Sequence, residues 1–195
     1  MAHQTINLSG LIILVADPSA YLCKLIQSML RGFGASKLLE ARDSLSLLRV
    51  LSVQKVDLLL CDANLRPHNG LMVTWSIRRN PNNENRTMPI LVMSSNTRDA
   101  AIKAARDVGA NMVIMKPMSP ASLYDRLAWV AFSQRQFVDT ATYFGPDRRF
   151  KIEGFPNGVG RRKGDKPVEV AKESGPTLAQ NDIDSLFTSA KTGQA

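Results

Sequence analysis

Short apolar runs and helix-like patterns alternate five times along the first 135 residues, and this alternation limits the fold more than any other feature. The expected strands cover residues 10–16, 37–41, 56–61, 89–93 and 111–115, and the first and third are the long apolar runs. A helical pattern follows each run, at 19–31, from 43 or 44, from 70, at 97–108 and from 119. Continuous apolar runs are typical of strands buried on both faces, and strand–helix repeats at this spacing predict right-handed crossovers. We therefore expect an α/β fold with a doubly wound, five-stranded parallel sheet.

The helical patterns also indicate which side chains face the sheet. In the first pattern the shared face consists of Leu22, Leu25, Ile26 and Met29. In the third pattern Val73 and Ile77 point inward together. Ser119 followed by Pro120 is typical of a helix start, because the N–H that proline lacks would be unpaired there anyway.

The apolar periodicity ends near Phe137, and the rest of the chain is rich in Gly, Pro, Asp and Arg. Such a composition buries too little apolar surface to fold by itself, so we expect a domain over 10–135 and a flexible, largely disordered tail over 136–195. Within the tail, Asn181 can cap a short amphipathic helix near 181–189. Its apolar residues are Ile183, Leu186 and Phe187.

The formal net charge is +8, and residues 1–135 hold most of the excess, with 16 Lys and Arg against 9 Asp and Glu. Clustered basic charge favours nucleic acid or anionic membranes, whereas scattered Lys and Arg are ordinary solvated residues. Cys23 and Cys61 each lie in an apolar stretch, which predicts buried free thiols rather than a disulfide framework. No stretch of the sequence approaches the roughly 18 apolar residues of a membrane span. We expect a cytoplasmic protein.

Four polar side chains follow the predicted strands: Asp17, Asp62, Ser94 and Lys116 come at the ends of the first, third, fourth and fifth runs. Because parallel strands bring their carboxyl ends to one edge, where ligands bind in doubly wound sheets, we expect these groups to meet. Two neighbouring carboxylates stay ionised together only if a cation joins them, and hard oxygen ligands suit Mg²⁺. A hydroxyl and an ammonium can hold the oxygens of a phosphoryl group.

Three segments carry a resemblance to a known family. They are Val-Asp-Leu-Leu-Leu-Cys-Asp at 56–62 with Gly70 eight residues later, Met-Pro-Ile-Leu-Val-Met-Ser at 88–94, and Gly-Ala-Asn-Met-Val-Ile-Met-Lys-Pro at 109–117. Together they resemble the receiver domain of two-component response regulators, the CheY-like family, over about residues 10–135. The resemblance implies a flavodoxin-like sheet in strand order 2-1-3-4-5.

The resemblance also implies roles for individual residues. Asp62 would accept a phosphoryl group from a histidine kinase or a histidine phosphotransferase. Asp17, Asp62 and the backbone carbonyl of Asn64 would hold Mg²⁺. The residues implied to bind the phosphoryl group or to respond to it are Ser94, Ser95 and Lys116. The protein would be a phosphoacceptor with self-catalysed transfer and slow dephosphorylation, not an enzyme, and would act through protein contacts, with chemotaxis as one pathway.

Three positions depart from the family pattern. Ala16 stands where the first of two adjacent acids is usual, so a water-mediated ligand is lost and weaker Mg²⁺ binding is expected. Arg66 stands four residues after Asp62, and the proline usual there is displaced to position 67. Val113 replaces the aromatic switch residue, which alters the usual coupling to the output face. A degenerate receiver that folds but is not phosphorylated therefore stays open as an alternative.

The end of the tail carries a second resemblance. Residues 178–187, Leu-Ala-Gln-Asn-Asp-Ile-Asp-Ser-Leu-Phe, resemble the N-terminal peptide of the flagellar switch protein FliM, to which phosphorylated CheY binds. We interpret Ile183, Leu186 and Phe187 as a docking segment for this receiver or another one, in the manner of a helix in a groove. The alternative is a disordered tail that contains one incidental helix.

Two other classes of function compete with these interpretations. Haloacid-dehalogenase-like phosphatases also place an aspartate nucleophile after a parallel strand, but they need a second acid two residues later, where this chain has Asn64. Binding of single-stranded nucleic acid is compatible with the basic cluster 148–166, which Phe150 and Phe155 interleave and Phe144 precedes. We identify no nucleic-acid recognition motif in the sequence.

Overall fold

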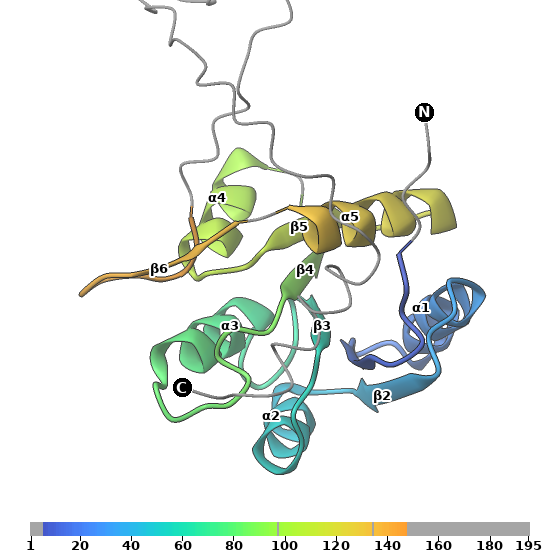
Figure 1. The fold of residues 1–195 in the computed structure, drawn as a ribbon, viewed down its shortest axis with the longest axis horizontal. Coiled ribbons are helices and arrows are strands. Elements are labelled where there is room, and N and C mark those ends of the chain that lie inside the picture. Colours follow the sequence, from blue (N-terminus) through green and yellow to red (C-terminus); the bar gives the residue numbers. More distant parts are fainter. Residues whose placement is uncertain (1–5, 97, 134, 148–195) are drawn as a thin grey trace, which may run out of the picture.

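The computed structural model describes residues 6–96, 98–133 and 135–147, drawn as a coloured ribbon in Figure 1. The strands of the main sheet are β1 (Ile12–Ala16), β2 (Lys37–Ala41), β3 (Leu58–Asp62), β4 (Ile90–Ser94) and β5 (Met112–Met115). The helices are α1 (Ala20–Gly32), α2 (Ser44–Val53), α3 (Gly70–Arg79), α4 (Asp99–Asp107) and α5 (Pro120–Phe132). Two short strands, β6 (Phe137–Asp139) and β7 (Phe144–Pro146), follow the last helix.

The five main strands form one parallel sheet in the order β2-β1-β3-β4-β5, which confirms the predicted doubly wound, flavodoxin-like fold. The register places the last residues of adjacent strands side by side. Ala16 pairs with Cys61, Asp62 with Met93, and Ser94 with Met115. The residues that end or directly follow β1, β3, β4 and β5 therefore share one edge of the sheet.

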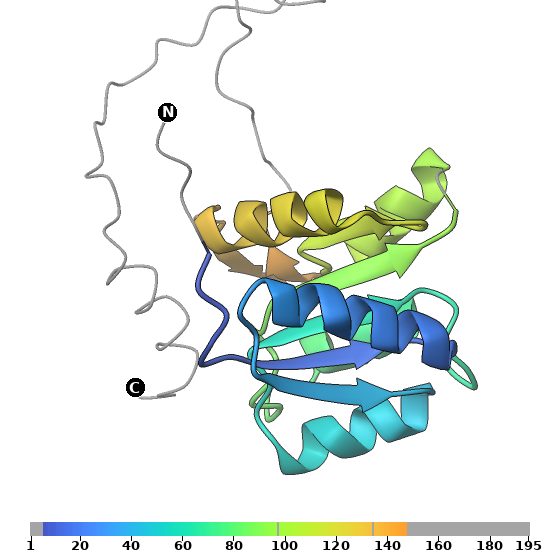
Figure 2. The same cartoon turned by 90° about the vertical axis from the view of Figure 1, so that its right-hand side faces the viewer.

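Helices cover both faces of the sheet, and each face has its own apolar core. In Figure 2, α1 and α5 lie in front of the strands, and their core includes Ile26 and Leu123. On the opposite face α2, α3 and α4 contribute Leu47, Ile77 and Ala105. Strands β3 and β4 are buried throughout, which is why their sequences are continuous apolar runs rather than alternating ones.

Side chains fix the starts of most helices. Ser19, Asp43, Asn69 and Ser119 each accept a hydrogen bond from the backbone N–H three residues later. The predicted start at Ser119 with Pro120 in the first turn is confirmed. No side-chain cap stands before α4, whose preceding residue is Arg98.

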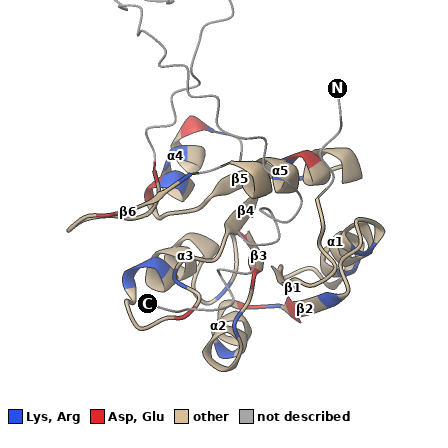
Figure 3. Cartoon of the chain, in the orientation of Figure 1, with Lys and Arg blue, Asp and Glu red and all other residues tan. Residues whose placement is uncertain are grey.

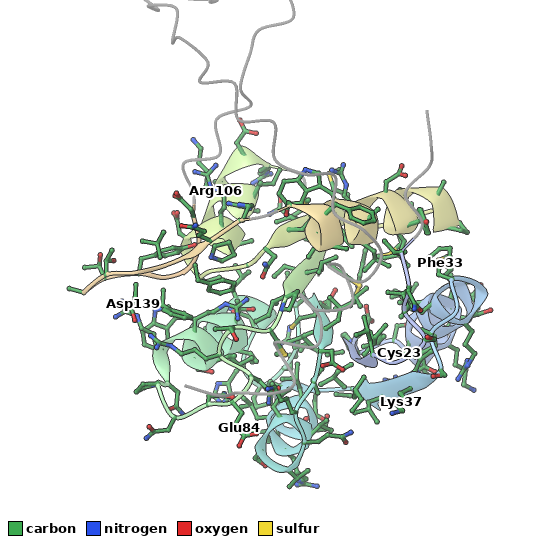
Figure 4. All side chains as sticks on the ribbon, viewed as in Figure 1. Cys23, Phe33, Lys37, Glu84, Arg106 and Asp139 are labelled. Carbon is green, nitrogen blue, oxygen red and sulfur yellow. The ribbon has the colours of Figure 1, made fainter. Side chains whose placement is uncertain are left out.

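Helix α1 faces the sheet with a register different from the predicted one. Cys23, which Figure 4 labels, is buried together with Ile26 and Leu30, whereas Leu25 is 38% exposed. The inward stripe is therefore rotated toward Cys23. The prediction for α3 is confirmed, because Val73 and Ile77 are both buried. Apolar periodicity alone could not distinguish the stripes of α1, because leucine occurs on both.

The ordered chain continues past residue 135, where the sequence predicts that the tail begins. Residues 137–146 form an antiparallel hairpin, β6–β7, which lies beside α3 in Figure 1. The rings of Phe137 and Phe144 contact each other, and arginines from outside the hairpin lie over them. Such contacts leave no strand-like periodicity in the sequence. Residues 148–195, including the predicted docking segment with Ile183, Leu186 and Phe187, lie outside the described residues.

Candidate functional site

The four polar residues predicted at strand ends lie at the carboxyl edge of the sheet, and three of them are in direct contact. The Lys116 ammonium donates hydrogen bonds to Asp17 Oδ2 and to Asp62 Oδ2 and forms an ion pair with each carboxylate. Asp17 and Asp62 are 1% and 3% exposed. A buried pair of carboxylates thus shares one cation, which reduces their mutual repulsion. With all three groups ionised, one negative charge is left over.

Backbone groups hold each carboxylate in place. The Asn64 N–H donates to Asp62 Oδ1 at 2.6 Å, and the Ser19 N–H donates to Asp17 Oδ1 at 2.8 Å. Each carboxylate therefore has one oxygen on the backbone and the other on Lys116. Lys116 itself is anchored where its N–H donates to the carbonyl of Ser94 at 2.9 Å. The result is a hydrogen-bonded arrangement of two acids and one ammonium.

Gly70 allows the chain to pass close to the acceptor strand. A Cβ atom at this position would lie 2.1 Å from the carbonyl oxygen of Asp62, so any larger residue would push α3 away from β3. The Gly70 N–H donates to the carbonyl of Ala63 at 3.1 Å, and Asn69 caps the helix by accepting from the N–H of Met72. The turn that carries Asn64 is therefore closed by a backbone contact.

The remaining predicted residues lie nearby but make other contacts. The Ser94 hydroxyl is buried at the end of β4 and accepts a hydrogen bond from the Asn96 N–H at 3.0 Å. Ser95 is exposed. Val113, the predicted altered switch position, is partly buried in β5 beside Val92.

Burial raises the pKa of the Cys23 thiol to about 11. Burial, followed by the charge of Asp62, raises the pKa of Cys61 as well. Both cysteines are free and buried, as the sequence predicts. Neutral thiols are poor nucleophiles, so neither cysteine is activated as a nucleophile at this edge.

The donors at this edge fit a magnesium ion. Carboxylate oxygens and a backbone carbonyl are the hard ligands that Mg²⁺ prefers. Among the described residues, no group of three or more His, Cys, Asp or Glu side chains is arranged to hold a metal. A bound Mg²⁺ would therefore keep several water molecules, as it usually does in proteins.

Sequence reasoning missed one polar side chain that contacts the site's backbone. Arg42 directly follows β2, and its guanidinium donates to the carbonyls of Asp17 and Pro18. The strand-end argument that identified Asp62 applies equally to this residue.

Charge elsewhere on the domain is distributed over the outer helices. Figure 3 shows basic residues on α2, α3 and α4 and acidic residues near the ends of the central strands. Phe144, one of the aromatics considered for nucleic-acid stacking, lies under the Arg86 guanidinium, 3.5 Å from ring centroid to carbon. None of the described helices combines the length and the apolar character that a bilayer span requires.

Comparisons with known proteins agree with this geometry. The family model of the response regulator receiver domain matches residues 13–128. The chain is 27% identical over 115 residues to chemotaxis protein CheY-3 of Vibrio cholerae, covering 59% of this chain and 87% of that protein. It is 30% identical over 129 residues, 66% of its length, to the sensory/regulatory protein RpfC of Xanthomonas campestris, but spans only 18% of it.

Solved structures share the fold. A putative response regulator from Chloroflexus aurantiacus superposes with a TM-score of 0.57 and 25% identity, over 62% of this chain and 96% of the other. The receiver domain of the sensor histidine kinase PA1611 from Pseudomonas aeruginosa is described with a magnesium ion coordinated in its active-site cleft. It superposes with a TM-score of 0.55 and 26% identity, over 62% of this chain and 97% of the other. The family match covers more than half of the chain and coincides with the sheet and its carboxyl-edge cluster. The chain therefore belongs to the response regulator receiver domain family, of the CheY-like type.

Proposed function

We propose that this protein is a phosphorylation-dependent signalling regulator that accepts a phosphoryl group on Asp62. The contact of Asp17, Asp62 and Lys116 at the carboxyl edge of the sheet carries the proposal. The donor would be the phosphohistidine of a histidine kinase or a histidine phosphotransferase, the partners usual for receivers. The protein would act in the cytoplasm and would have no separate substrate to turn over.

The chain's own residues would mainly position groups and neutralise charge, as phosphoryl transfer requires. A carboxylate oxygen of Asp62 would attack the phosphorus as the bond to the histidine nitrogen breaks. Asp17, Asp62 and the Asn64 carbonyl would hold Mg²⁺, which supplies positive charge to the phosphoryl oxygens. Lys116 would move from its bridging position to bond the phosphoryl group.

The hydroxyls of Ser94 and Ser95 supply the remaining donors. Ser94 Oγ bonds the backbone of Asn96, so it would exchange this contact for a phosphoryl oxygen. Because Val113 has no aromatic ring to reorient, we expect the change to reach the output face through the backbone of β4 and β5. Ala16 leaves one acid fewer for Mg²⁺, and we expect weaker metal binding than in receivers with two acids.

The output would be a protein contact. CheY-3 of Vibrio cholerae is named a chemotaxis protein, and this relationship supports motility as the pathway to test first. Met72 and Trp75 on α3 are 56% and 51% exposed, which supports a contact patch on this helix. The tail segment with Ile183, Leu186 and Phe187 is the other candidate for partner binding.

The test is incubation of the full chain with acetyl phosphate and Mg²⁺, comparing the wild type with Asp62→Asn. We expect acid-labile, hydroxylamine-sensitive phosphate on the wild type only, because an amide cannot form an acyl phosphate. Omission of Mg²⁺ should lower the yield strongly. No phosphate on the wild type, with Mg²⁺ binding intact, would leave the degenerate receiver as the function. Sustained release of phosphate from many equivalents of donor would favour the alternative function of a haloacid-dehalogenase-like phosphatase.

A further inference from the structure

The turn between β2 and α2 contacts both loops that carry the proposed metal ligands. We call residues 41–46 the β2–α2 corner. The Asp17 N–H donates to the carbonyl of Ala41 at 3.1 Å, which ties the β1–α1 loop to this corner by its backbone. Two side chains, those of Arg42 and Ser44, add further contacts, one toward each loop.

Arg42 holds the loop that follows β1. Its Nε donates to the Asp17 carbonyl at 3.2 Å, and its Nη2 donates to the carbonyl of Pro18. The same guanidinium lies 3.5 Å from Glu40 Oε1, and Glu40 Oε2 accepts from Gln27 of α1 at 3.2 Å. A planar guanidinium with donors in fixed directions suits two adjacent carbonyls better than an ammonium does.

Ser44 holds the loop that follows β3. Its backbone N–H donates to the carbonyl of Arg66 at 2.9 Å, and its fully buried hydroxyl accepts from the His68 N–H at 3.0 Å. The corner itself is stiffened by reciprocal hydrogen bonds between Asp43 and Ser46. The same rigid turn therefore contacts the loop of Asp17 and the loop of Asn64.

We propose that Arg42 and Ser44 are positioning residues for the magnesium site, fixing the separation between its two ligand-bearing loops. This inference rests on the proposed function. With Ala16 in place of an acid, only Asp17 and Asp62 supply carboxylates, and the Asn64 carbonyl comes from a loop. A site with few ligands depends strongly on preorganisation, and groups that orient metal ligands commonly affect affinity by 10–100-fold.

Charge and geometry make opposite predictions at Arg42, which allows a sharp test. Arg42→Met removes a cation near the metal site, so an electrostatic role alone would tighten Mg²⁺ binding. Loss of positioning would weaken it. Arg42→Lys keeps the charge but loses the two-armed contact, so it separates the two roles.

The first measurement is titration of the full chain with MgCl₂, followed by the amide NMR signals of residues 62–64. We expect roughly tenfold weaker binding for Arg42→Met and for Ser44→Ala, with Arg42→Lys in between. Matched controls are Arg49→Met and Ser52→Ala, exposed residues of α2 away from both loops, which should bind Mg²⁺ like the wild type. Unchanged or tighter binding by Arg42→Met and Ser44→Ala would overturn the proposal.

The second measurement is amide hydrogen exchange without metal, which does not depend on the proposed function. We expect faster exchange at residues 17–19 in Arg42→Met and at 64–68 in Ser44→Ala, with the strands unchanged in both variants. Exchange equal to the wild type in these loops would overturn the proposal even if Asp62 is phosphorylated. If the wild type itself binds no Mg²⁺ while both loops respond as expected, the proposed function fails and the positioning contacts stand.

Discussion

A cation lies at each end of the sheet, and the groups that accept its hydrogen bonds differ in charge. At the carboxyl end, Lys116 lies between two carboxylates. At the amino end, Arg78 of α3 is 1% exposed, and the oxygens that accept its hydrogen bonds are neutral. They belong to the carbonyls of Gly109 and Arg86 and to the amide of Asn111. Lys116 thus neutralises carboxylates, whereas Arg78 binds neutral oxygens, two of them backbone carbonyls.

The pKa of Lys116 is raised and that of Arg78 is lowered, in line with this difference. Burial lowers the pKa of Lys116, but its hydrogen bonds to Asp17 and Asp62, together with their charges, outweigh that effect and raise the pKa above 10.5. For Arg78, burial lowers the pKa to about 9, and only the charge of Tyr143 counters it. The ring of Phe137, 5.1 Å from the guanidinium carbon, adds a cation–π contact.

The two ends therefore differ in how much negative charge surrounds the cation. The carboxyl end has two carboxylates for one ammonium, so under the proposed function Mg²⁺ would enter there and Lys116 would be free to move. The amino end has no such excess: Arg78 joins α3 to the α4–β5 turn, where Gly109 packs under the β6–β7 hairpin. A Cβ at Gly109 would lie 2.7 Å from the carbonyl oxygen of Phe144.

Removing the cation at the amino end should have the largest effect on stability. We expect Arg78→Ala to lower the free energy of unfolding by roughly 3–5 kcal/mol, because it leaves a cavity and unpaired buried oxygens. Chemical denaturation followed by circular dichroism measures this. The control is Arg79→Ala on the exposed side of α3, whose guanidinium donates to the carbonyls of Ala141 and Thr142 and which should cost less than about 1 kcal/mol.

Removing the cation at the carboxyl end should cost less, and added metal should restore the loss. We expect Lys116→Met to lower the unfolding free energy by about 2–3 kcal/mol, because two buried carboxylates then face each other unpaired. Mg²⁺ should stabilise this variant more than the wild type, since it no longer competes with an ammonium. Equal stabilisation of both proteins by Mg²⁺ would contradict an exchangeable cation. The same denaturation experiment, with and without MgCl₂, provides the measurement.

A larger side chain at Gly145 should destabilise the packing of the β6–β7 hairpin. A Cβ at Gly145 would lie 2.8 Å from Gly109 Cα and 2.6 Å from the Tyr143 hydroxyl, so Gly145→Ala should destabilise the domain by about 1–2 kcal/mol. Gly10→Ala is the control, because no atom lies within 4 Å of its Cβ position. Faster amide exchange confined to 137–146 would show that the hairpin detaches. Equal behaviour of the two variants would mean that it is not packed on the sheet end.

The pH dependence should be the smallest effect. Because the folded-state pKa of Lys116 is raised above 10.5, its stabilising contribution is complete below pH 10.5 and is lost as pH rises through the higher folded value. The stability difference between wild type and Lys116→Met should therefore be constant near neutral pH and shrink only above pH 10.5. A difference that already shrinks between pH 7 and 9 would contradict the ion pairs.

Much of the fold could be predicted from the sequence because β3 and β4 are apolar throughout and end at Asp62 and Ser94. Their positions directly after parallel strands also predicted that Asp17, Asp62 and Lys116 lie at one edge of the sheet. The family resemblance implied a pairing of Lys116 with phosphate or with Asp62, but not the second ion pair with Asp17, which depends on side-chain conformation. The position of Arg42 directly after β2 could be recognised by the same reasoning, but its contacts with the carbonyls of Asp17 and Pro18 could not.

The β6–β7 hairpin is a part of the fold that the sequence did not predict. Residues 137–146 contain turn-forming Gly and Pro, and their composition indicated a tail. The groups that fix them are arginines of α3 and the following loop, far away in sequence: Arg86 Nη2 lies 3.3 Å from Asp139 Oδ2, and Figure 4 shows Asp139 on the hairpin. Local composition carries no information about such partners. The chain's order at this point is set by tertiary contacts.

Asp62 at the carboxyl edge is the proposed acceptor of the phosphoryl group. The direct measurement is to treat the full chain with acetyl phosphate and Mg²⁺, reduce the acyl phosphate with borohydride, and map the product by peptide mass spectrometry. We predict homoserine at position 62 and an unmodified aspartate at position 17. An unmodified Asp62, or modification only at another carboxylate, would contradict the account.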